Sequence, residues 1–170
     1  MDTDTLMDID EYRYGALTKT RLDFTKEGGF TAAVEMCNGV GACRKLHAGA
    51  MCPSYMATRE EQHTTRGRAN TLRGVLSGSL PHDKLDSKNL LNVLDLCLEC
   101  KSCKSECPSN VDMAKIKYEY LYQYYKTQKV PLRSKLVADI HRMNSLSAPM
   151  APIANMVNRS APVRFLLEKT

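Results

Sequence analysis

The chain has 170 residues, of which 43% are hydrophobic, 25% are charged and only 6% are aromatic, and its net charge is +5. This length is enough for one compact domain with a modest core, and the composition excludes a disordered polyelectrolyte. No run reaches the roughly 18–20 apolar residues that span a bilayer, so we expect no membrane span. The acidic start, MDTDTLMDIDEYR, lacks the apolar run of a signal peptide, so we expect a cytoplasmic protein with reduced thiols.

Charge is distributed unevenly along the chain. Residues 1–30 contain seven acidic and four basic residues, whereas residues 115–170 contain ten basic and three acidic ones. Residues 1–30 show no helical periodicity, and we interpret them as a leader that ends a preceding domain. We interpret the basic excess as the solvated face of helices, and we expect no nucleic-acid partner.

Helical patterns begin near Thr31, where TAAVEM leads into the first cysteine. Residues 58–78 are expected to be helical overall. Thr58 and Glu61 have the spacing of a capping box, and Gly67 is a point at which the helix is interrupted.

The apolar residues of KNLLNVLDLCLEC, from Leu90 to Leu98, predict another helix with one buried face. The stretch SNVDMAKIKYEYLYQYYK is the clearest helix, and Ser109 or Asn110 is its expected cap. RSKLVADIHRMNSL and APIANMVNRSAPVRFLLEKT, each bounded by proline or serine, predict two more. The expected fold class is therefore all-α.

The seven cysteines form two groups. The second group spells C-x2-C-x2-C-x3-C-P: Cys97, Cys100, Cys103, Cys107 and Pro108. This is the spacing with which bacterial ferredoxins bind iron–sulphur clusters, and the fourth cysteine of such a motif binds the other cluster of a pair. The first group is a distorted copy: Cys37 and Cys43 have the spacing of first and third ligands, Val40 occupies the middle position, and Cys52-Pro53 follows after a longer gap.

Assigning the last cysteine of each group to the cluster of the other group gives one definite set of ligands for each cluster. Cluster one takes Cys97, Cys100, Cys103 and Cys52, and this complete set predicts a [4Fe–4S] cluster. Cluster two takes Cys37, Cys43 and Cys107. It is either a [3Fe–4S] cluster, with Val40 at the empty corner, or a [4Fe–4S] cluster with a non-cysteine ligand, for which His47 is the candidate. Zinc is the competing metal, but its four-thiolate sites usually show two separated C-x2-C pairs.

Two arginines, Arg66 and Arg68, lie between the cysteine groups. A cluster with its thiolates carries negative charge, so nearby guanidinium groups are candidates for tuning its potential. The alternative is that one arginine is solvated and the other forms a structural ion pair.

The stretches CNGVGACRK, MCPSY, TTRGRANTLRG and LDLCLECKSCKSECPSNVDMAKIKYEYL closely resemble the iron–sulphur segment of bacterial FAD-linked oxidases. These are proteins similar to D-lactate or D-2-hydroxyglutarate dehydrogenases, and they are related to the iron–sulphur subunits of glycolate oxidase and anaerobic glycerol-3-phosphate dehydrogenase. The resemblance implies a two-cluster ferredoxin-like helical domain, like the helical half of the succinate dehydrogenase iron–sulphur subunit. A gap like that between Cys37 and Cys43 accompanies a [3Fe–4S] cluster in that subunit.

The resemblance also implies the domain organisation and the function. Residues 1–30 would be the leader, 31–128 the two-cluster ferredoxin-type domain, and 129–170 a basic helical tail or a linker to a missing downstream domain. The chain would relay single electrons from an FAD-containing oxidase domain or subunit to a downstream acceptor, a quinone-linked one among the options. It would work in the cytoplasm, or peripherally at the inner face of the membrane, and would not oxidise a hydroxy acid alone. Two alternatives remain open: a zinc-stabilised nucleic-acid-binding module, and a catalytic cluster with an open iron.

Overall fold

The structure, a computed structural model, describes residues 19–80 and 85–168. The regular elements of these residues are all helices, and no strand occurs among them, which confirms the expected all-α fold class. By its internal contacts the chain divides into two compact units, Met1–Gln128 and Lys129–Thr170.

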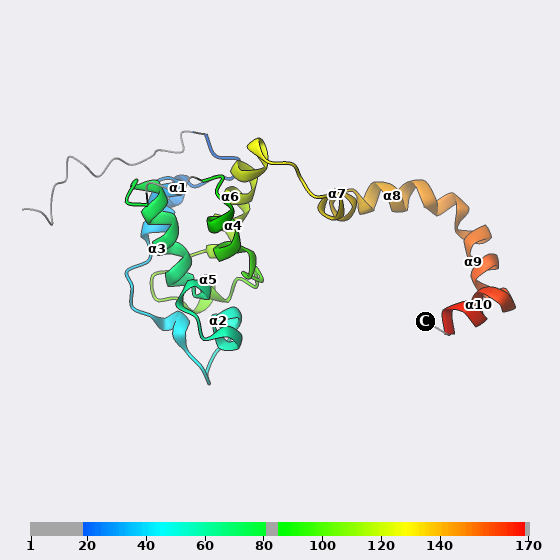
Figure 1. The fold of residues 1–170 in the computed structure, drawn as a ribbon, viewed down its shortest axis with the longest axis horizontal. Coiled ribbons are helices and arrows are strands. Elements are labelled where there is room, and N and C mark those ends of the chain that lie inside the picture. The colour runs from blue at the N-terminus through cyan, green and yellow to red at the C-terminus, as the bar shows by residue number, and fades with distance from the viewer. Residues whose placement is uncertain (1–18, 81–84, 169–170) are drawn as a thin grey trace, which may run out of the picture. The chain divides into compact units, whose positions relative to one another are not determined.

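The first unit is a cluster of short helices (Figure 1). Its α-helices in the described residues are α1 Phe30–Glu35, α2 Pro53–Thr58, α3 Thr65–Leu76, α4 Lys88–Asp95, α5 Ser102–Glu106 and α6 Met113–Thr127. Three single turns of 3-10 helix accompany them: η2 Thr25–Glu27, η3 Ala42–Arg44 and η4 Glu61–His63. Helix α3 packs against α1 and α4, and α1 also packs against α6.

The predicted apolar faces of α4 and α6 form much of the core. Leu90 and Leu94 of α4 are buried, as are Ile116 and Tyr120 of α6. Burial of such side chains is the main stabilising contribution to a small domain. Leu98, expected on the same face as Leu90, lies beyond the end of α4 and is 69% exposed.

Helix α3 begins later than the sequence predicted. Its cap is Thr64, whose hydroxyl oxygen accepts a hydrogen bond from the backbone N–H of Gly67 at 2.7 Å. Thr58 instead ends α2, so its predicted capping role was wrong. Gly67 does not interrupt α3. It lies in the first turn, where a Cβ atom would collide with the carbonyl oxygen of Glu61.

The cap of α6 also differs from the prediction. Asp112 caps the helix, because its carboxylate accepts a hydrogen bond from the backbone N–H of Lys115 at 3.0 Å. Ser109 and Asn110, the predicted caps, precede the completely buried Val111. The chain therefore inserts an apolar side chain into the core before the helix begins.

Part of the expected leader lies inside the first unit. The buried rings of Phe24 and Phe30 contact each other edge to face, with centroids 5.4 Å apart. The buried carboxylate of Glu119 in α6 accepts hydrogen bonds from the backbone N–H groups of Arg21 and Leu22, both at 2.9 Å. Residues 1–18 lie outside the described residues, so the leader as a whole remains a prediction.

The second unit is a succession of four short α-helices, where the sequence predicted two. They are α7 Leu132–Ala138, α8 Ile140–Ser147, α9 Ala151–Arg159 and α10 Ala161–Glu168, with the 3-10 turn η5 Ala148–Met150 between α8 and α9. Prolines at 149, 152 and 162 favour the boundaries before α9 and α10, because a proline inside a helix removes a hydrogen bond and clashes with the preceding turn.

Large apolar side chains along these four helices are exposed, in contrast to the first unit. They are Leu132, Leu136, Val137, Ile140, Met143, Leu146, Met150, Ile153, Met156, Val157 and Phe165. None of the helices within 19–80 and 85–168 combines the length and the apolar character needed to cross a bilayer. The role of residues 129–170 as a tail or linker remains a prediction.

Candidate metal centre

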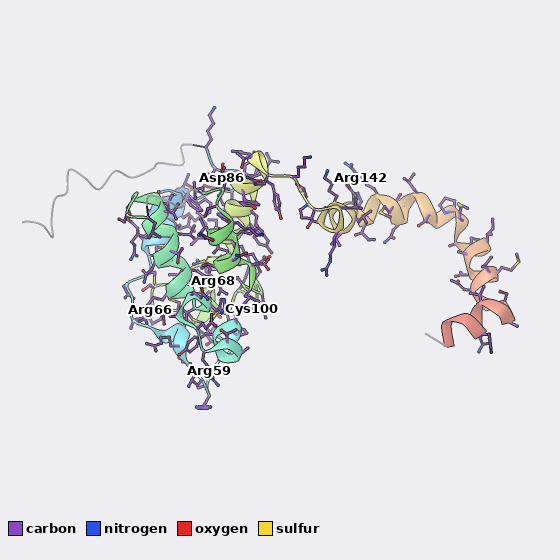
Figure 2. The ribbon with its side chains drawn as sticks, in the orientation of Figure 1. Arg59, Arg66, Arg68, Asp86, Cys100 and Arg142 are labelled. Atoms are coloured by element: carbon purple, nitrogen blue, oxygen red, sulfur yellow. The ribbon has the colours of Figure 1, made fainter. Side chains whose placement is uncertain are left out.

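Four cysteines line one pocket of the first unit. Cys52 precedes α2, Cys97 and Cys100 lie in the loop after α4, and Cys103 lies in α5. The structure therefore brings Cys52 to the other three, although 44 residues or more separate them in the sequence. Arg68 lines the same pocket as Cys100, and both residues are labelled in Figure 2.

The other three cysteines line a second pocket. Cys37 follows α1, Cys43 lies in η3 and Cys107 follows α5. Val40 also lines this pocket and is 61% exposed. His47 is exposed and is not among the lining residues, so the structure does not bring this candidate ligand to the pocket.

The two pockets share a wall. Met51 and Thr65, both almost completely buried, line both of them. Met51 directly precedes Cys52, and Thr65 is the first residue of α3. The two groups of thiols are thus separated by the side chains of the protein interior.

The thiols surround spaces rather than a single point. All seven cysteines are free, and the pockets measure about 330 and 220 Å³, their open mouths included. Among the described residues, no three His, Cys, Asp or Glu side chains are arranged to hold one metal ion. This arrangement fits a multi-atom group better than a single zinc ion, around which four ligands converge at about 2.0–2.3 Å.

The loop that carries Cys97 and Cys100 has an unusual backbone. Glu99 and Lys101, on either side of Cys100, have φ angles of 56° and 61°, a conformation that non-glycine residues rarely adopt and that recurs at functional sites. The nearly buried Lys117 of α6 donates to the carbonyl oxygen of Cys97 at 2.8 Å and pairs with Glu99 at 2.9 Å. Helix α6 thereby holds the loop in its curled shape.

Arg68 is 0% exposed, yet it has no carboxylate partner among the ion pairs of the described residues. Its guanidinium donates to Cys52 Sγ at 3.4 Å, to Ser54 Oγ at 2.9 Å and to the carbonyl oxygen of Val93 at 3.1 Å. A buried cation is stable only when an opposite charge accompanies it. An anionic, thiolate-bound cluster in this pocket would supply that charge, so these residues fit such a group.

Arg66 has different surroundings. Its side chain pairs with Glu61 at 2.7 Å and donates to the carbonyl oxygen of Gly39 at 3.0 Å. The hydrogen bond from Arg66 lowers the pKa of the Glu61 carboxyl. The backbone N–H of Arg66 donates to Cys43 Sγ at 3.4 Å, so Arg66 contributes to the second pocket mainly through its main chain.

Burial raises the pKa of the thiols of Cys43, Cys97 and Cys103. Backbone amides that point at the sulphurs oppose this effect, and for Cys103 they belong to Met113 and Ala114 at the N-terminus of α6. Such amides stabilise a thiolate. Iron must displace protons from these thiols, and the amides then remain as hydrogen-bond donors to the sulphurs.

Sequence reasoning missed several of these contributors, among them Met51, Ser54, Thr65 and Lys117. Lys117 lies among tyrosines in an amphipathic helix, where a lysine is ordinarily a surface residue. Its partners Cys97 and Glu99 lie 20 and 18 positions away in the chain, so no local pattern identifies it.

Comparison with known proteins identifies the part of the chain that contains both pockets. Residues 36–112 match the family described as a 4Fe-4S dicluster domain. The chain is similar to that family over these residues, which make up less than half of its length. The matched segment contains all seven cysteines, and the match favours iron–sulphur clusters over zinc.

Relatives of the chain include the proteins suspected from the sequence. A D-2-hydroxyglutarate dehydrogenase of Pseudomonas putida is 31% identical over 65% of this chain and 14% of its own length, and one of Escherichia coli is 26% identical over 96% of this chain and 19% of its own length. The glycolate oxidase iron-sulfur subunit of Escherichia coli is 34% identical over 46% of this chain and 18% of its own length. The resemblance is therefore confirmed, and the chain spans about a fifth or less of these relatives. No solved structure matches it.

Proposed function

We propose that the chain is a two-cluster electron relay. Cys52, Cys97, Cys100 and Cys103 hold a [4Fe–4S] cluster, and a second cluster is held by Cys37, Cys43 and Cys107. The observation that supports this proposal is the division of the seven thiols between two pockets, with Cys52 and Cys107 each beside the other group. Each cluster, when bound, accepts and donates one electron at a time.

The second cluster is a [3Fe–4S] cluster in this proposal. Three cysteines line its pocket, and Val40, which lines the same pocket, has no group that binds iron. A histidine ligand is the alternative, but His47 is exposed and outside the lining.

The chain's own residues set the environment of each cluster. Arg68 places its buried positive charge at Cys52, which favours the more negative, reduced form of the first cluster. Arg66 donates its backbone N–H to Cys43. Lys117 fixes the loop of Cys97, while Met51 and Thr65 exclude water from the space between the pockets.

The donor in this proposal is the flavin of an FAD-linked 2-hydroxy-acid dehydrogenase, as another domain or another subunit. Support comes from relatives named D-2-hydroxyglutarate dehydrogenase and glycolate oxidase iron-sulfur subunit. The acceptor is a downstream redox centre, with a quinone-linked one among the options. A location of the chain in the cytoplasm, at the inner face of the membrane, would bring it close to such an acceptor.

The test is anaerobic purification followed by iron and acid-labile sulphide counts and electron paramagnetic resonance. We expect seven irons and eight sulphides per chain, the sum of one [4Fe–4S] and one [3Fe–4S] cluster, and a three-iron signal in the oxidised protein. Photoreduced flavin should reduce the clusters reversibly, with no turnover of hydroxy acids.

Other results would contradict the relay. Colourless protein that contains zinc and no sulphide would indicate the zinc module. Dehydratase activity of the isolated chain would indicate an open iron. Eight irons without a three-iron signal would leave the relay intact but would show that the second cluster has a non-cysteine ligand.

A further inference from the structure

The segment between Cys43 and Cys52 is an unusual part of the chain. Eight residues separate these cysteines, whereas three separate Cys103 from Cys107 in the regular motif. Residues 44–50 are exposed and contain no regular helix beyond Arg44. A loop of this length has many conformations, so spacing alone does not fix the position of Cys52.

One side chain ties the end of this loop to another part of the site. Glu106 accepts a hydrogen bond from the backbone N–H of Ala50 at 2.7 Å and another from that of Met51 at 3.2 Å. Gly49, with a φ angle of 75°, lies so close that a Cβ atom there would collide with the Glu106 carboxylate. Three consecutive loop residues thus surround one carboxylate.

These contacts matter because Glu106 lies between cysteines of the two pockets. It is the last residue of α5, between Cys103 of the first pocket and Cys107 of the second. The residues it binds directly precede Cys52. The carboxylate therefore joins the two segments that cross between the pockets.

We propose that Glu106 is a positioning residue that holds Cys52 in place as the fourth ligand of the first cluster. This inference rests on the proposed function, because it assumes that Cys52 joins Cys97, Cys100 and Cys103. Glu106 itself touches no iron. It compensates for the long loop by fixing its last two residues against α5.

The test is the substitution Glu106→Gln in the full chain, loaded anaerobically. Glutamine keeps one acceptor oxygen, so it can still accept one of the two backbone N–H groups. In place of the second carboxylate oxygen it presents an N–H group, which repels the other backbone N–H. With Cys52 released, the first cluster should lose its fourth iron. The three-iron signal of the oxidised protein should rise by about twofold relative to the wild type.

Three other variants make the result specific. Cys52→Ala removes the ligand directly and should produce the same additional signal. Gly49→Ala places a side chain at a positive φ angle and against the Glu106 carboxylate, so it should disturb the same contacts and change the spectrum in the same direction. Ser105→Ala is the matched control on α5, because its hydroxyl bonds only to the carbonyl oxygen of Ser102, and its spectrum should equal that of the wild type.

Each outcome separates this inference from the relay. If the wild type contains no iron and sulphide, the proposed function fails. Suppose that the wild type carries its clusters and that Cys52→Ala adds the three-iron signal. If Glu106→Gln then adds no such signal, the role of Glu106 is refuted and the relay stands. Simultaneous loss of both clusters in Glu106→Gln would also refute it, because the proposed role is confined to Cys52.

Discussion

Two arginines that are two positions apart in the sequence meet different surroundings. Arg66 is partly exposed and neutralised by Glu61, whereas Arg68 is buried beside Cys52 without a carboxylate. The difference arises from the period of α3, because residues two positions apart point in directions about 200° apart on a helix. At the scale of single residues, the first pocket therefore contains an uncompensated positive charge.

We predict that Arg68→Met lowers the reduction potential of the four-cysteine cluster. The lost hydrogen bond and charge stabilise the reduced form more than the oxidised form, and a difference of about 1 kcal/mol corresponds to roughly 40 mV for a one-electron couple. A redox titration followed by electron paramagnetic resonance measures the change. Arg68→Lys should lower the reduction potential less than Arg68→Met does, because lysine keeps the positive charge.

Arg66→Met is the matched control for this prediction. Its guanidinium is paired with Glu61, and only its backbone N–H contacts a thiol, which the substitution preserves. The potential of the four-cysteine cluster should stay at the wild-type value. An equal fall in both variants would show that general surface charge, rather than the contact of Arg68 with Cys52, sets the potential.

At the residue scale, the sequence predicted two sets of cysteines, and the same two sets line the two pockets, but it did not predict the residues that support them. The regular spacing from Cys97 to Cys107 restricts which thiols can share a cluster, and the irregular first group follows by analogy. Lys117 and Glu106 have no such signature. Each contacts a loop 20 or more residues away, and a single sequence contains no information on that pairing.

At the scale of secondary-structure elements, helices flank the proposed cysteine ligands, but most of these cysteines lie outside the helices. Cys52 directly precedes α2 and Cys107 directly follows α5, whereas Cys37 and Cys97 lie two residues beyond the ends of α1 and α4. At the start of α3, η4 passes close to Gly67.

We predict that Gly67→Ala destabilises the loaded protein by about 1–3 kcal/mol, the usual cost of overpacking. The new methyl group meets the backbone carbonyl of Glu61, which cannot move without shifting η4. Gly74→Ala is the control in the same helix, because its methyl group meets only the flexible end of Leu80 and alanine favours helix formation by about 1 kcal/mol. Thermal melting followed by circular dichroism compares them, and equal midpoints would contradict the crowding.

Helix existence was predictable here, and helix boundaries were not. Leu90 with Leu94 and Ile116 with Tyr120 have helical spacing, and all four are buried. Helix caps are harder to predict, because Ser, Thr, Asn and Asp can all cap a helix and several of these residues precede each helix. The tertiary position of Val111 decided between Asn110 and Asp112, and no local rule contains that information.

At the scale of the whole first unit, we expect stability to depend on the metal sites. Its helices are short, its core is modest, and the buried charge of Arg68 has no protein counter-charge among the described residues. Metal binding to such a domain contributes directly to the free energy of folding.

We predict that the chain without iron is largely unfolded. Removal of iron with a chelator under reducing conditions should abolish the cooperative thermal transition, and reconstitution with iron and sulphide should restore it. Circular dichroism and the sensitivity of the first unit to protease measure the change. A cooperatively melting form without iron would contradict the prediction.

The shared wall of Met51 and Thr65 has a consequence for the proposed relay. If each pocket holds a cluster, two one-electron carriers lie on either side of two side chains, and together they would store both electrons of a two-electron oxidation. A flavin donor would then be fully reoxidised by the pair before the final acceptor is reduced.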